Sequence, residues 1–90
     1  MYEPVTPSVL KRVLEQIGYR LFDANAVCWM MKCGGHLIPI SQTMALVPSD
    51  VLDGMLGPAD IDADAFNSLA RDIQAGIIPP TTKSATARPN

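Results

Sequence analysis

The sequence predicts a small α+β domain in which one helix precedes three antiparallel strands and two further helices follow them. Three observations predict this order. Apolar residues recur at helical spacing before residue 19 and again after residue 41. Between them, within 19–41, short apolar runs alternate with turn residues. The connections between these runs are too short for the crossovers that parallel strands need. The chain has 90 residues, which suits one domain with one thin core. We expect that domain to span residues 1–76.

The first helix is predicted for residues 7–17. Thr6 is a suitable N-cap, and Pro7 suits the first helical position. Apolar residues then recur on one side of the helix until Gly18 ends the pattern. Residues 1–5 are expected to be only a short lead into this helix.

Three short strands are predicted next. Apolar and aromatic runs separated by turn residues place them at 19–22, 26–32 and 36–41. The short connections favour an antiparallel meander. Pro39 cannot donate a ladder hydrogen bond, so the third strand should lie at a sheet edge or carry a bulge.

The alternation of side chains along a strand assigns residues to the two faces of this sheet. Two helices can cover one face, and we expect Val27, Trp29 and Met31 to point toward them, with Trp29 in the core. The residues that this assignment leaves on the other face are Cys28, Met30, Lys32, Leu37 and Pro39, the last two because Ile38 and Ile40 would point inward.

Two helices are predicted after the sheet. The first opens at residues 47–50, and Gly57-Pro58 ends it. Asp62 caps the second, which Gly76 closes. Residues 77–90 lack apolar periodicity and are expected to form a disordered tail.

Composition narrows the class of protein. The chain is 48% hydrophobic and 18% charged, which is too apolar for a disordered protein. No uninterrupted apolar run is long enough to span a bilayer, and no signal peptide is evident, so we expect a soluble, cytoplasmic protein.

Residues 1–49 carry four basic and three acidic groups, whereas residues 50–76 carry one basic and six acidic groups. Such a balance predicts weak RNA binding at most.

No metal or cofactor is expected. Cys28, Cys33 and His36 have a spacing compatible with zinc, but the chain has no fourth Cys or His to complete a structural site. The Asp60-x-Asp62-x-Asp64 run resembles the start of a calcium loop. Ala65 stands where that loop requires glycine, which excludes it.

The order of elements and several short motifs resemble the HicA (YcfA-like) toxins of toxin–antitoxin systems. The motifs that carry the resemblance lie within residues 7–73 and are Gly18-Tyr19, Ile38-Pro39-Ile40, Val51-Leu52-x-x-Met55-Leu56 and Phe66. The resemblance implies a fold like that of double-stranded-RNA-binding domains and, for typical members, activity as an mRNA interferase.

One departure from that family bears on catalysis. The turn between the first two strands usually carries Gly-Ser-His in the family, and its His is catalytic, whereas this chain has Ala26-Val27-Cys28. A second position that is often polar or His is Ser41 here. General acid–base catalysis near neutral pH suits an imidazole, whereas an unperturbed thiol with a pKa of about 8.5 is a poor substitute.

The sequence therefore predicts a HicA-like protein without catalysis that acts by protein–protein contact, in a toxin–antitoxin or mobile-element setting. The predicted interface is Cys28, Met30, Lys32, Leu37 and Pro39, with a protein partner or a second copy of the chain. One alternative is a metal-independent endoribonuclease with His36 as relocated catalytic residue. In that case the candidate phosphate contacts are Lys11, Arg20 and Lys32. Another alternative is a homodimeric adaptor that contacts no nucleic acid.

Overall fold

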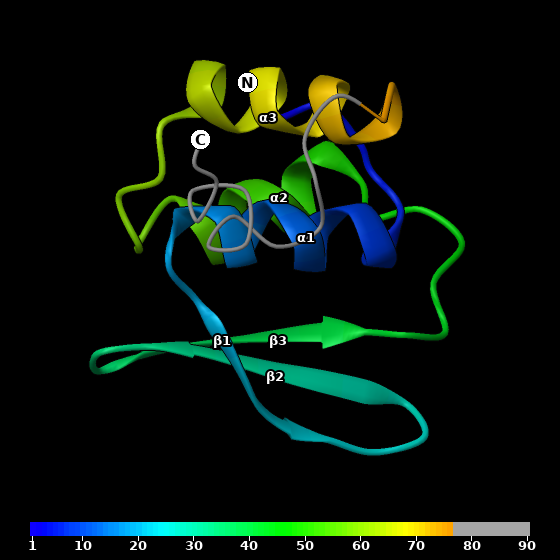
Figure 1. Ribbon diagram of the computed structural model, residues 1–90, viewed down its shortest axis with the longest axis vertical. Coiled ribbons are helices and arrows are strands. Elements are labelled where there is room, and N and C mark those ends of the chain that lie inside the picture. The colour runs from blue at the N-terminus through cyan, green and yellow to red at the C-terminus, as the bar shows by residue number, and fades with distance from the viewer. Residues whose placement is uncertain (77–90) are drawn as a thin grey trace, which may run out of the picture.

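The computed structural model describes residues 1–76, and the predicted tail at 77–90 lies outside the described residues. The predicted α-β-β-β-α-α order is confirmed (Figure 1). The elements are α1 (Pro7–Ile17), β1 (Arg20–Ala24), β2 (Cys28–Cys33), β3 (His36–Ser41), α2 (Ser49–Leu56) and α3 (Ala63–Gln74).

The elements form layers, which are seen edge-on in Figure 1. A three-stranded antiparallel sheet in the order β1-β2-β3 forms one side of the molecule. Helices α1 and α2 lie over one face of this sheet, and α3 lies across them on the side away from the sheet (Figure 1). Within residues 1–76, no helix or strand covers the opposite face of the sheet.

Helix α1 has the bounds predicted from the sequence. The Thr6 hydroxyl accepts a hydrogen bond from the Val9 N–H at 3.3 Å, and Pro7 occupies the first turn. At the other end, Gly18 has a φ of 126°, and its N–H donates to the Leu14 carbonyl at 3.1 Å. The apolar side of α1 thereby lies in the core, where Leu14 is fully buried.

The two C-terminal helices also lie where the sequence predicts them. The Asp62 carboxylate accepts a hydrogen bond from the Ala65 N–H at 3.0 Å and caps α3. Pro48 is the N-cap of α2, and this end has no side-chain capping bond. The buried residues of α3 are Phe66, Asn67, Ala70 and Ile73.

The inward face of the sheet supplies part of the core. Met31 in β2 and Ile38 and Ile40 in β3 are all buried. Met31 lies opposite Ile38 in the β2–β3 ladder, and paired residues of an antiparallel sheet point to the same face. The predicted orientation of β2 and β3 is therefore confirmed for these residues.

The first hairpin differs from the prediction in the bounds of its two strands. Strand β1 runs to Ala24, so Asp23 and Ala24 belong to the strand, and Val27 belongs to the turn. The Asn25 side chain is the physical reason, because its carbonyl oxygen accepts hydrogen bonds from the Val27 and Cys28 N–H groups, both at 2.9 Å. An Asx turn of this kind ends the strand two residues later than the composition suggested.

Two predicted core positions on this hairpin are less buried than expected. Val27 is 56% exposed because it lies in the turn rather than under the helices. Trp29 is half-buried and packs against the core from its margin, with the Lys11 ammonium 5.7 Å from its ring centroid.

The N-terminal segment 1–5 contributes two residues to the core, so the expectation of only a short lead was wrong. Tyr2 and Val5 are buried, and Val5 forms an isolated antiparallel bridge with Val47. The Tyr2 ring meets Phe66 edge-to-face at 5.4 Å between centroids, and its hydroxyl donates a hydrogen bond to the Ile61 carbonyl. These contacts join residues distant in sequence, which is why no local pattern predicted them.

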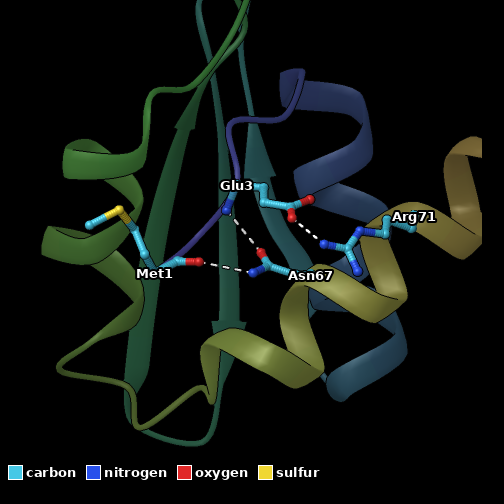
Figure 2. Close-up of polar contacts among 4 residues, drawn as sticks. All are labelled: Met1, Glu3, Asn67 and Arg71. Atoms are coloured by element: carbon cyan, nitrogen blue, oxygen red, sulfur yellow. Dashed lines mark hydrogen bonds and ion pairs between the residues drawn. The ribbon is translucent and has the colours of Figure 1, made fainter.

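Asn67 holds this N-terminal segment to α3, as Figure 2 shows. Its amide nitrogen donates to the Met1 carbonyl at 2.9 Å, and its amide oxygen accepts from the Glu3 N–H at 2.8 Å. One turn further along α3, Arg71 forms an ion pair with Glu3 (Figure 2). A buried amide that satisfies two backbone groups fixes the position of the segment more strongly than an exposed ion pair does.

We expect Asn67→Ala to lower the free energy of unfolding by about 1–3 kcal/mol. The substitution leaves a part-buried N–H and a carbonyl without partners. Urea unfolding followed by circular dichroism measures the change, with Ser68→Ala on the exposed side of α3 as control. Equal stability of the Asn67 variant and the control would contradict this role.

We also expect stability to fall at alkaline pH through Tyr2. Burial, followed by the nearby carboxylates of Asp53, Asp62 and Asp60, raises its pKa above the usual 10. A raised pKa of an acid means that the unfolded chain loses its proton first. The stabilisation that the folded protein gains from protonated Tyr2 is therefore fully present below pH 10, and it is lost as the pH rises through the pKa of Tyr2 in the folded state. Unfolding measured between about pH 9 and about pH 11 should show a shallower decline for Tyr2→Phe. An identical decline in both proteins would contradict the prediction.

Candidate binding face of the sheet

The face of the sheet that points away from the helices carries the predicted interface. We call it the open face and define it by Arg20, Phe22, Cys28, Met30, Lys32, Leu37 and Pro39. Its exposed large apolar side chains include Phe22, at 61%, and Leu37, at 52%. The structure thus brings all five predicted interface residues together on one surface.

The β2–β3 register sets which residues of the open face are neighbours. Met30 lies opposite Pro39, and Lys32 lies opposite Leu37. Met30 is half-buried, whereas Pro39 and Leu37 are exposed. The middle of the open face is therefore apolar, and exposed apolar groups gathered on one surface are typical of an interface.

The end of the open face near the β2–β3 turn is positively charged. Arg20 in β1 lies directly opposite Lys32 in β2, so both point to the same side. The Lys32 ammonium lies 4.8 Å from the ring centroid of Phe22. Neither Arg20 nor Lys32 forms an ion pair within residues 1–76. The carboxylate of Asp23, which is also in β1, accepts a hydrogen bond from the Ala24 N–H instead.

Lys11, the third candidate phosphate contact, lies apart from these two cations. It belongs to α1 on the helix side of the sheet, where it pairs with Glu15 at 2.9 Å and lies near the ring of Trp29. The structure therefore groups Arg20 with Lys32 and leaves Lys11 out of their site.

The opposite end of the open face contains the position at which the resembled family carries its catalytic His. Cys28 lies opposite Ser41 there. The Cys28 thiol donates to the Trp29 carbonyl at 3.5 Å, and the Ser41 hydroxyl is 3.0 Å from that of Thr43. No imidazole or carboxylate among residues 1–76 bonds to either group, so neither has a base to activate it.

Two polar residues, Asn25 and Gln42, form several hydrogen bonds at this end of the open face. Besides the Asx turn of Asn25, the Gln42 amide donates to the Asn25 carbonyl at 2.7 Å, and the Gln42 N–H donates to the Val27 carbonyl at 2.9 Å. Asn25 carries a recognisable turn signal in the sequence, but the contact of Gln42 spans two hairpins and has no local signal.

His36 lies at the far end of β3 from Ser41, opposite Cys33. It borders a hollow of about 330 Å³ that Tyr19, Asp60 and Asp62 also line. Its imidazole makes no hydrogen bond within the described part of the chain and is exposed. The strand therefore separates the one imidazole from the Cys28 and Ser41 pair.

The described residues contain no group of three or more His, Cys, Asp or Glu side chains placed to hold a metal ion. Over the same residues, the structure has no helix with the length and apolar character needed to cross a membrane.

Comparison of the chain with protein-family models, curated proteins and solved structures finds no match. The HicA-like assignment therefore stays a prediction from the sequence motifs.

We expect Asn25→Ala to destabilise the first hairpin by about 1–2 kcal/mol, since the Val27 and Cys28 N–H groups lose their acceptor. Amide hydrogen exchange should accelerate at Val27 and Cys28 in particular. Thr43→Ala, which removes an exposed hydroxyl nearby, is the matched control. Unchanged exchange in Asn25→Ala would show that the turn does not depend on this side chain.

Proposed function

We propose that this protein is a non-catalytic binding protein that contacts another protein through its open face. The observation that carries the proposal is the exposure of Phe22, Leu37 and Pro39 on a sheet face that no helix or strand within residues 1–76 covers. Aromatic residues are enriched at protein interfaces, and the fully buried core of an interface is more apolar than the rest of the protein surface.

The arrangement of nucleophiles and bases argues against catalysis. Ribonucleases that act through the 2′-hydroxyl need a base and an acid within hydrogen-bond reach of the reacting atoms. Cys28 and Ser41 lie together without a base, and His36 lies at the other end of β3. Neither the Cys28 and Ser41 pair nor His36 therefore has both a base and an acid within reach, as such a reaction requires.

The distribution of charge argues for protein rather than RNA as the partner. The open face has two cations, Arg20 and Lys32, beside Asp23. Six aspartates of residues 50–72 belong to α2, α3 and their connection, on the helix side of the sheet. A nucleic-acid surface needs several phosphate-neutralising side chains on one face, which this surface lacks.

The two edges of the sheet favour contact through the face over strand addition. β1 has a bulge between Leu21 and Asp23, which interrupts the regular ladder. The β2–β3 register is unbroken at Pro39, although proline has no N–H to donate to the ladder. Pro39 therefore lies at a position where the backbone nitrogen faces the free edge of β3 and not β2. Bulges and prolines are common means of blocking edge-to-edge pairing, so a homodimer built by joining sheets is disfavoured.

The biological setting that we propose is cytoplasmic, in a toxin–antitoxin or mobile-element context. This part of the proposal rests on the motifs that resemble the HicA toxins. In that setting, a protein without the catalytic His would act on its partner by binding and not by RNA cleavage.

Leu37→Asp tests the proposal, because it replaces an exposed apolar side chain of the open face, opposite Lys32, with a charged one, and Leu37 is already half exposed. We expect the variant to fold normally and to lose at least about tenfold in affinity for the partner. Ser68→Asp, which adds the same charge to the exposed side of α3, is the matched control. Partner capture from the native host, followed by titration of the isolated partner, measures the difference.

Equal affinity of the wild type, Leu37→Asp and Ser68→Asp would show that the partner does not use the open face. Cleavage of single-stranded RNA by the purified protein without metal, lost in His36→Ala, would instead establish the mRNA interferase alternative. Reversible dimerisation in sedimentation velocity that Leu37→Asp abolishes would identify the partner as a second copy of the chain.

A further inference from the structure

We propose that the charged end of the open face binds a carboxylate side chain of the partner, next to an apolar residue of the same partner segment. This inference rests on the proposed function and adds the chemistry that the partner must present. The site consists of Arg20 and Lys32 as anion-binding groups and of Phe22 and Leu37 as the apolar surface beside them.

The first observation is that two like charges lie directly opposite each other without a counter-ion. Arg20 and Lys32 form a cross-strand pair on one face, an arrangement that destabilises a sheet. The one carboxylate nearby in β1, that of Asp23, accepts a hydrogen bond from its neighbour's N–H instead. The ion pairs that the structure records within residues 1–76 involve Lys11 and Arg71. A bound anion would relieve the repulsion that the folded protein leaves in place.

The second observation is that the site is hollowed and that one of its cations lies against an aromatic ring. Arg20, Leu21, Phe22, Lys32 and Gly34 line a hollow of about 300 Å³ at this end of the sheet. The Lys32 ammonium lies over the Phe22 ring, 4.8 Å from its centroid, and this cation–π contact favours that placement of the charge. Gly34 has a φ of 58°, a conformation that suits glycine in the tight turn after β2.

The composition of the hollow selects the ligand. A guanidinium and an ammonium at paired positions of one face can both donate charge-assisted hydrogen bonds to a single carboxylate. The neighbouring side chains on the open face are apolar, with Phe22 61% exposed and Leu37 52% exposed. A polyphosphate chain would need further cations along the face, whereas an acidic side chain followed by an apolar one matches both parts of the surface.

A second copy of the chain is a competing source of carboxylates, because α2, α3 and their connection carry six aspartates. A contact between the open face of one copy and the helices of another would be heterologous, and such contacts produce open chains of molecules unless the rotation closes a ring. Because a heterologous contact of this kind has no built-in closure, we assign the carboxylate to a different protein.

The test uses the full-length protein labelled with ¹⁵N and two synthetic peptides. One is acetyl-Asp-Leu-Asp-Phe-amide, and the control is acetyl-Asn-Leu-Asn-Phe-amide, which has the same shape without the charges. With the acidic peptide at millimolar concentration, we expect amide shifts at residues 20–22 and 32–37. We expect far smaller shifts with the control peptide.

Arg20→Gln and Lys32→Gln should each weaken binding of the acidic peptide by roughly tenfold, since each removes a charge-assisted hydrogen bond. Lys11→Gln, which removes a cation on the helix side of the sheet, should leave binding unchanged. Arg20→Gln should also melt at the same temperature as the wild type or higher, because it removes the repulsion from Lys32 and keeps the Lys32–Phe22 contact.

Four results would overturn the inference. Equal binding of both peptides, or no shift at all on the open face, would show that no carboxylate site exists there. Shifts with a single-stranded RNA oligonucleotide that depend on Arg20 and Lys32, without shifts from the peptide, would assign the anion as phosphate. Concentration-dependent association of the protein alone that Arg20→Gln abolishes would assign the carboxylates to a second copy.

These results are separate from a failure of the proposed function. If Leu37→Asp abolishes partner binding while Arg20→Gln and Lys32→Gln do not change it, the open face binds the partner and the carboxylate site is wrong. If none of the three variants changes partner binding, the proposed function itself is wrong.

Discussion

The burial of one face of a three-stranded sheet is the constraint on which the other features depend. Met31, Ile38 and Ile40 lie under the helix layer and are buried. Because side chains alternate along a strand, the neighbours of these residues must point away from the helices. A shift of the register by one residue would exchange the two sets and expose the core, so burial of one set fixes the other. The composition of the open face is therefore tied to the packing of the core.

The side of the core that lies away from the sheet is covered by the N-terminal segment and α3, and the open face takes no part in it. The N-terminal segment lies against α3, where Tyr2 packs on Phe66 and Asn67 satisfies two backbone groups of the segment (Figure 2). A domain of this size has only a few kcal/mol of net stability, so these contacts matter for folding. The exposed side chains Leu37 and Pro39 contribute little to that core, which leaves their chemistry free to serve a binding role.

The bulge in β1 shapes the charged end of the open face. It lies between Leu21 and Asp23, where β1 has one residue more than β2. The extra residue, Phe22, lies beside Lys32, and Arg20 remains opposite Lys32 on the same face. The interruption that discourages strand addition at this edge therefore also assembles an aromatic ring and two cations at one place.

The sequence by itself determined the order of elements, because each helix and strand has a local pattern. Thr6-Pro7 and Asp62 begin helices through capping bonds, and the apolar periodicity continues them. The same alternation predicted that Met30, Lys32, Leu37 and Pro39 share a face. Tertiary structure alone decided which residues distant in sequence meet: Tyr2 with Phe66, Asn67 with the N-terminal segment, and Gln42 with Asn25. It also set the β1 register, and with it the pairing of Arg20 with Lys32, because a bulge depends on the partner strand and the adjoining turn. Hydrogen bonds and packing between separate segments leave no periodic pattern in the chain, so only the folded structure reveals them.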